Sequence, residues 1–157
     1  MDRQILTFSC SNENYAVDVA RVVEVSRFGG AARIPNAAPA VIGVVNLRGQ
    51  IIPIVDMARV LDGGATEPPK WQVVVFVTVT TQGRARMVGL LVDSVNDVED
   101  LPAEGLLPPP DTSAGGEQFV EGLYYVDGHA TVVLDIEAVV GEMAEAKTSP
   151  AAEAAAL

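Results

Sequence analysis

An internal repeat is the feature that most constrains how this chain can fold. Two glycines and an aspartate recur 79 residues apart: Gly43, Gly49 and Asp56 return as Gly122, Gly128 and Asp135. The apolar residues of 51–55 match those of 130–134 at the same offset. Turn glycines and helix-capping aspartates are common enough to match by chance. Here the turn, the cap and the apolar register agree, which favours two related units.

A second offset extends the repeat towards the N-terminus. Residues 15–19 resemble 88–92, and residues 23–25 resemble 96–98, both 73 positions later. Each unit therefore has two strands, a bridge of valines and acids, a long loop, a hairpin and a capped helix. About five short strands per unit, arranged without exposed edges, predict small barrels. The predicted fold class is all-β with short helices, as two barrels packed side by side.

The pattern along the chain places the individual elements. Strands are expected at residues 4–9, 15–19, 41–47, 51–55, 71–80, 86–92, 119–126 and 130–134. A strand or a short helical turn would both fit residues 19–25. Asp56 and Asp135 are expected to cap short helices, since aspartate is a preferred N-cap residue. Residues 144–157 form an Ala/Glu-rich segment that is expected to be a disordered tail.

The charge of the chain argues against nucleic acid as a partner. The net charge is −11, and residues 87–157 hold one basic residue against fourteen acids. Such a surface would repel phosphate backbones. The longest apolar stretch, Trp71–Val79, is too short to span a bilayer, and the start lacks the pattern of a signal peptide. We expect a soluble, cytoplasmic protein without direct membrane insertion.

Residues able to support catalysis are few. The single cysteine, Cys10, and the single histidine, His129, cannot form a disulfide or a zinc cluster of Cys and His. We expect Cys10 to be a buried small hydrophobe and His129 to be an exposed turn residue. The acids of 93–100 lack the spacing of a calcium loop and are expected to form a solvated face. The sequence therefore predicts no enzyme, no cofactor and no metal site.

The segment VIGVVNLRGQIIPIVD at Val41–Asp56 resembles the signature hairpin of the CheW family of bacterial chemotaxis coupling proteins. Further matches follow in order at Tyr15–Val19 with Val22–Val25, at 34–37, at Val88–Val95 with 97–98, and from Val120 to Glu137. The resemblance covers roughly residues 4–141. It implies two five-stranded SH3-like barrels. The expected first barrel spans approximately 15–70, and the second approximately 71–141 with a contribution from the N-terminal strand.

The resemblance also implies a function and its sites. Members of the family have no catalytic activity and link the cytoplasmic tips of methyl-accepting chemoreceptors to the regulatory domain of the histidine kinase CheA. They do so in receptor arrays at the inner face of the cytoplasmic membrane. The residues expected at the receptor surface are Val22, Glu24, Arg48, Val95 and Val98. Those expected at the kinase surface are Gly43, Val44, Asn46 and Leu47.

Each of these residues also has a purely structural interpretation. Single valines are more often core residues, Arg48 can be a solvated turn residue, and Gly49 and Gly128 are expected to serve the hairpin turns. Three alternatives for function stay open. The chain could be an adaptor of a pilus-motility or other chemosensory array, part of a CheA-like kinase, or a free-standing double barrel that binds a ligand.

Overall fold

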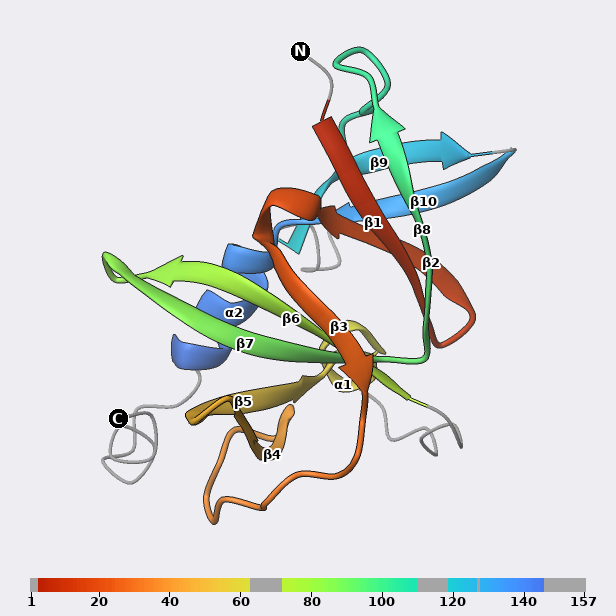
Figure 1. The fold of residues 1–157 in the computed structure, drawn as a ribbon. Coiled ribbons are helices and arrows are strands. Elements are labelled where there is room, and N and C mark those ends of the chain that lie inside the picture. Colours follow the sequence, from red (N-terminus) through yellow and green to blue (C-terminus); the bar gives the residue numbers. More distant parts are fainter. Residues whose placement is uncertain (1–2, 63–71, 110–118, 127, 146–157) are drawn as a thin grey trace.

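The computed structural model describes residues 3–62, 72–109, 119–126 and 128–145 (Figure 1). The strands are β1 Arg3–Cys10, β2 Glu13–Asp18, β3 Val22–Arg27, β4 Val41–Leu47, β5 Gln50–Asp56, β6 Val73–Thr81, β7 Arg84–Val92, β8 Ser94–Leu101, β9 Val120–Val126 and β10 His129–Leu134. The helices are η1 Val19–Arg21, α1 Met57–Asp62 and α2 Ile136–Glu145. The ambiguous segment 19–25 contains both expected forms, a single helical turn followed by a strand. The acid-rich bridge after residue 93 is also a strand, β8.

The strands form two sheets with the same internal order. One sheet runs β8-β1-β2-β10-β9, and the other runs β3-β6-β7-β5-β4. Each sheet contains two hairpins, β1–β2 with β9–β10 and β6–β7 with β4–β5. The two hairpins of a sheet are joined by one parallel pair, β2 with β10 and β7 with β5. The other neighbouring strands are antiparallel. The predicted all-β class with few short helices is confirmed.

Each sheet curls until its two ends meet. The segment that follows β3 pairs with β4 through Ala32 and Val44, by reciprocal backbone hydrogen bonds of 2.9 and 2.8 Å. The segment that follows β8 pairs with β9 in the same way through Leu107 and Leu123, at 2.8 and 2.9 Å. These bridges close both sheets into small barrels, and the repeat thereby appears in the hydrogen bonding as well as in the sequence.

The sheets divide the chain differently from the predicted boundary near residue 70. Residues 22–92 supply every strand of one sheet, whereas the other takes residues 3–18 and 94–134. The reason is that each repeat divides after its first hairpin. Strands β3, β4 and β5 join β6 and β7, and strands β8, β9 and β10 join β1 and β2. The chain crosses between barrels at η1 and again at Asp93. We call the barrel of residues 22–92 the inserted barrel and the other the split barrel.

The structure has three apolar clusters, one inside each barrel and one that joins the two. The inserted barrel contains Ile52, Ile54, Val74, Phe76 and Leu91, and the split barrel contains Ile5, Ala16, Leu101 and Val133. The third and largest cluster lies between the sheets and joins residues of β1, β2, β6, β7 and both helices. Valine and isoleucine suit such strands because their branched side chains pack well on a pleated surface.

Helices α1 and α2 begin directly after Asp56 and Asp135, as predicted. The Asp56 carboxylate accepts a hydrogen bond from the Ala58 amide at 3.1 Å, and the Asp135 carboxylate accepts one from the Ala138 amide at 3.2 Å. Such caps satisfy amides that have no partner within the helix. The predicted tail begins at Ala144, but that residue and Glu145 belong to α2, and the remainder lies outside the described residues. None of the described helices has the length and apolar character needed to cross a membrane.

Candidate functional site

The structure joins Glu24 and Arg48, which are distant in sequence. Glu24 lies on β3, and Arg48 lies in the turn between β4 and β5. The Arg48 Nη1 and Glu24 Oε1 atoms are 2.6 Å apart. The arginine side chain is 74% exposed and the glutamate side chain 24% exposed. The pair therefore presents a cation to solvent, while the carboxylate that holds it is largely covered.

Arg48 owes its position to the geometry of the turn. Arg48 and Gly49 have φ values of 51° and 86°, so both central residues of this two-residue turn lie in the left-handed region. Glycine adopts such angles without steric cost, and paired positive φ values match the twist of a hairpin. The Asn46 side chain accepts a hydrogen bond from the Gly49 amide at 2.8 Å. Gly128 has a φ of 80° in the corresponding turn of the split barrel.

The three predicted valines face the space between the two sheets. Val22 lies opposite Val77, Val95 opposite Phe8, and Val98 opposite Leu6. Directly opposed residues of antiparallel strands project to the same face. Because Val77, Phe8 and Leu6 belong to the cluster between the sheets, Val22, Val95 and Val98 face that same space. The structure thus brings the edge strand of each barrel to a common face.

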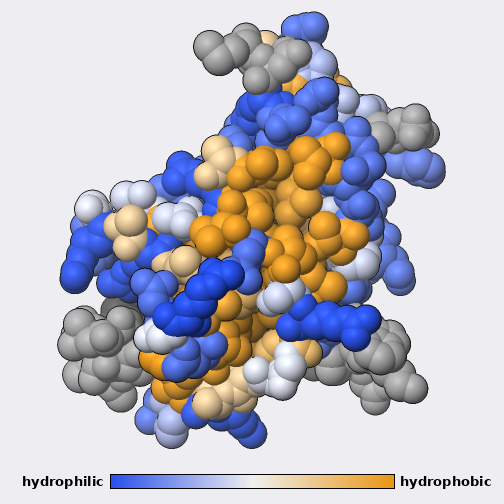
Figure 2. Space-filling view, in the orientation of Figure 1, coloured by the Kyte–Doolittle hydropathy of each residue, from blue (hydrophilic) through white to orange (hydrophobic). Residues whose placement is uncertain are grey.

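That face is partly uncovered. Val22 and Val95 are half-buried against the cluster, whereas Val98 is 46% exposed. Val23 and Val25 on β3 are also exposed, and sequence reasoning missed both. A β-bulge between Val22 and Glu24 shifts the register at this point. Figure 2 shows a hydrophobic surface across the side of the molecule on which β1 and β3 lie nearest the viewer in Figure 1. We call the exposed valines Val23, Val25 and Val98, with half-buried Val22 and Val95, the valine face.

The strand predicted to contact a kinase, β4, closes the inserted barrel. A side chain at Gly43 would overlap the backbone of Ala32, so glycine is required for closure. Val44, Asn46 and Leu47 border an open groove of about 480 Å³ between β4 and the segment after β3. Gly43 was predicted as a binding residue, but the structure gives it a role in closing the barrel. Val44, Asn46 and Leu47 reach the surface.

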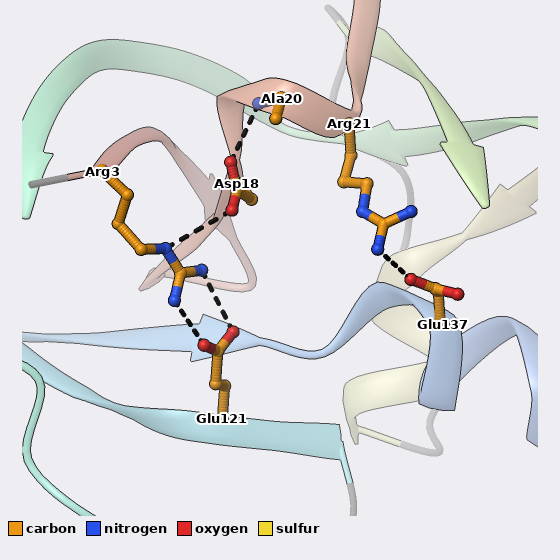
Figure 3. Close-up of polar contacts among 6 residues, drawn as sticks. All are labelled: Arg3, Asp18, Ala20, Arg21, Glu121 and Glu137. Carbon is orange, nitrogen blue, oxygen red and sulfur yellow. Dashed lines mark hydrogen bonds and ion pairs between the residues drawn. The ribbon is translucent and has the colours of Figure 1, made fainter. Parts of the chain in front are cut away.

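Ion pairs hold the first crossing between the barrels (Figure 3). Arg3 on β1 contacts both Asp18, which caps η1, and Glu121 on β9. The hydrogen bonds that Arg3 donates to the Glu121 carboxylate raise the pKa of the Arg3 guanidinium above its ordinary value, and partial burial opposes this effect. Arg21 of η1 pairs with Glu137 in the first turn of α2. These contacts tie the crossing segment to the split barrel and to the helix that packs on β6.

The remaining chemistry-bearing residues are dispersed. Cys10 is buried and His129 is exposed, as predicted. Of the four acids expected to form a solvated face, Asp97 and Asp100 are exposed. Asp93 and Glu99 are half-buried, and the Asp93 carboxylate accepts a hydrogen bond from the Ser11 amide at 3.0 Å. Within the described ranges, no three His, Cys, Asp or Glu residues are grouped so that they could hold a metal ion.

Comparison with known proteins assigns the chain to a family. The CheW-like domain model matches residues 4–143. The chain belongs to the CheW family. Its relatives include the chemotaxis protein CheW of Rhizobium meliloti, 31% identical over 87% of this chain and 86% of the relative. The chemotaxis protein CheW of Klebsiella aerogenes is 32% identical over 86% of this chain and 80% of the relative.

A solved CheW structure has the same architecture. The scaffolding protein TtCheW from Thermoanaerobacter tengcongensis superposes with a TM-score of 0.78 at 28% identity, covering 88% of this chain and 92% of that one. The resemblance of the hairpin at Val41–Asp56 to the CheW signature is thereby confirmed for the whole domain.

Proposed function

We propose that this CheW-family chain is a non-catalytic chemotaxis scaffold that links the cytoplasmic tips of chemoreceptors to the regulatory domain of the histidine kinase CheA. The observation that carries the proposal is the valine face, an apolar surface that two edge strands from different barrels share. The relatives, two chemotaxis proteins and a scaffolding protein, support the same role. The protein then works at receptor arrays on the cytoplasmic side of the membrane.

The receptor surface in this proposal is the valine face together with Glu24 and Arg48. Glu24 lies opposite Phe76 and Val25 opposite Val75, so the ion pair projects from the other face of β3 and borders the valine face at its edge. A shallow aliphatic surface suits the apolar side of an amphipathic helix, which is how receptor tips would present themselves. Arg48 retains most of its hydrogen-bonding capacity because it is 74% exposed and contacts Glu24 through one guanidinium nitrogen, Nη1. It would set the orientation of the helix, since rim charges favour one register over others.

The kinase surface in this proposal is β4, through Val44, Asn46 and Leu47. These residues lie on the inserted barrel at the end of a sheet, away from the β8 edge of the split barrel. A barrel of similar shape could pack there while the valine face holds a receptor. The two proposed surfaces adjoin at the β4–β5 turn, where Leu47 precedes Arg48, and a scaffold requires that both be occupied at once.

The test is a pull-down with purified CheA and a receptor cytoplasmic fragment, each alone and both together. We expect each partner to bind alone and both to bind simultaneously. In a phosphotransfer assay the chain should remain unlabelled, because its single histidine, His129, is an exposed residue beside a hairpin turn and the described residues bring no base to it. Competition between the two partners, or stable transfer of phosphate to this chain, would contradict the scaffold role.

A further inference from the structure

Both edge strands carry valines at a spacing that a regular strand would direct to opposite faces. Val22 and Val25 on β3 are three positions apart, and so are Val95 and Val98 on β8. Successive side chains of a strand alternate between its two faces, so residues an odd number of positions apart diverge. All four valines nevertheless lie opposite residues of the cluster between the sheets. Each strand therefore contains one residue more than regular pairing allows.

A β-bulge accommodates that residue at the same place in both repeats. The register of β3 against β6 passes over Val23, and the register of β8 against β1 passes over Asn96. The two positions are 73 residues apart, which is the offset of this part of the repeat. A bulge that takes up one residue returns side chains three positions apart to a common face. The two bulges are therefore one feature of the repeat, and each aligns a pair of valines.

Side-chain hydrogen bonds hold the bulge of β8. Thr7 on β1 lies opposite Asp97, the first paired residue after the bulge. The Thr7 hydroxyl donates to the Asp97 carbonyl and accepts from the Asp97 amide, both at 3.1 Å. The Asn96 side chain donates to the Ser9 hydroxyl at 3.1 Å. The corresponding residue opposite the β3 bulge is Phe76, whose side chain has no hydrogen-bonding group. The two equivalent bulges are thus held by different means.

The alternative register of β8 would place a charge in the valine face. Without the bulge, Asn96 would enter the ladder and every later residue of β8 would turn to the opposite face. Asp97 would then replace Val98 opposite Leu6, which belongs to the cluster between the sheets. The Thr7 hydroxyl uses its donor and one of its acceptor lone pairs on Asp97 in the bulged register. It therefore favours the register that presents a valine instead of a carboxylate.

We propose that Thr7 is a positioning residue for the receptor surface: its hydroxyl holds the bulge at Asn96, and the bulge aligns Val95 with Val98. The proposal rests on the proposed function, because it concerns the surface to which a receptor would bind. Thr7 is only 7% exposed, so it acts through the valines and does not itself touch the receptor.

The decisive variant is Thr7→Val, which removes the hydroxyl and keeps the branched shape of the side chain. The Asp97 amide and carbonyl then lose this partner at the bulge. We expect binding of the purified receptor cytoplasmic fragment to weaken by about tenfold or more. Binding of the CheA regulatory domain should be unchanged, because β4 lies in the other barrel. Amide hydrogen exchange should become faster at Val98 and stay unchanged at β6.

Two control variants separate the hydroxyl from packing in general. Thr7→Ser keeps the hydroxyl and should retain most of the receptor affinity. Thr131→Val changes the other buried threonine of the described chain, which lies outside the β1–β8 ladder. The repeat has Ile52 at the equivalent position, so an aliphatic side chain fits there, and receptor binding should be unchanged. The proposal is overturned if Thr131→Val loses as much receptor binding as Thr7→Val, or if Thr7→Val loses kinase binding equally.

Deletion of Asn96 tests the alignment itself. Without this residue, Val95 opposite Phe8 and Val98 opposite Leu6 belong to a regular strand, so both valines share a face with no bulge to hold. Added to Thr7→Val, the deletion should restore receptor binding. If the chain with both changes binds the kinase domain but not the receptor fragment, the hydroxyl does not act by aligning the valines, and the proposal is overturned.

Failure of the proposed function has a different outcome. If the wild-type chain does not bind the receptor fragment, the scaffold role fails and the positioning role fails with it. If the wild type and Thr7→Val bind the receptor fragment equally well, the positioning role alone is overturned and the scaffold role stands.

Discussion

The contact between Glu24 and Arg48 contributes little to folding because the arginine is mostly solvated. Exposed ion pairs add about 0–1 kcal/mol to stability, and Arg48 is 74% exposed. Arg48→Glu should therefore lower the free energy of unfolding by no more than about 1 kcal/mol. Receptor coupling should fall far more, since like charges at an interface are strongly unfavourable. The measurements are thermal melting and receptor-stimulated CheA kinase activity.

The double reversal Glu24→Arg with Arg48→Glu is the control for this pair. It restores an attraction of opposite polarity at the same place. Partial recovery of coupling would mean that the pair orients the receptor surface, and no recovery would mean that Arg48 touches the receptor directly. Full activity of the single Arg48→Glu variant would reduce Arg48 to a turn residue.

Gly43 and Gly49 are glycines for different reasons: Gly43 allows two backbones to approach closely, and Gly49 adopts the positive φ of a turn. A side chain at Gly43 would overlap Ala32, whereas a side chain at Gly49 would meet no neighbouring atom and strain only the positive φ. Gly43→Ala must displace the closing bridge and should cost about 2–3 kcal/mol. Gly49→Ala should cost about 1 kcal/mol. Urea denaturation of both variants measures the difference, and equal losses would show that closure does not depend on Gly43.

Among the elements, α2 joins the barrels because it follows the last strand of one sheet and packs on β6 of the other. Its first turn depends on the Asp135 cap at the Ala138 amide. Asp135→Ala should lower the free energy of unfolding by about 0.5–2 kcal/mol, because that amide loses its acceptor. Asp135→Asn keeps an acceptor and should retain most of the stability. Circular dichroism during thermal melting gives both values, and identical losses in the two variants would argue against the cap.

Local signals made the hairpins and capped helices predictable from the sequence. The Arg48-Gly49 turn, the Asp56 cap and the apolar register each act within a few residues, so their outcome does not depend on the rest of the fold. The partners of β3 and β8 were not predictable, because both repeats offer an equivalent first strand. The exposure of Val23 and Val25 depends on a bulge against β6, and the groove depends on the path of a loop. Neither leaves a periodic signal.

The whole molecule is an interleaved pair of barrels, and its cohesion follows from the cluster between them. Residues 22–92 contain every strand of the inserted barrel, yet β6 and β7 place Val75, Val77, Val79, Val88, Leu90 and Val92 against the split barrel and α2. Separation would expose this entire apolar face to water. Burial of apolar surface contributes roughly 25 cal/mol per Å², so neither barrel is expected to retain its stability alone.

The last prediction is therefore that the chain unfolds as one unit. Chemical denaturation should give a single transition, with the same midpoint by circular dichroism and by amide hydrogen exchange at β1 and at β6. A fragment of residues 22–92 should show no cooperative transition, although it holds a complete sheet, because Leu6, Phe8 and Val17 no longer cover its outer face. Arg21→Ala, which removes the contact with Glu137 at the crossing, should lower the midpoint slightly without splitting the transition. Two separate transitions in the intact chain, or a stably folded fragment, would mean that the cluster between the sheets does not couple the barrels.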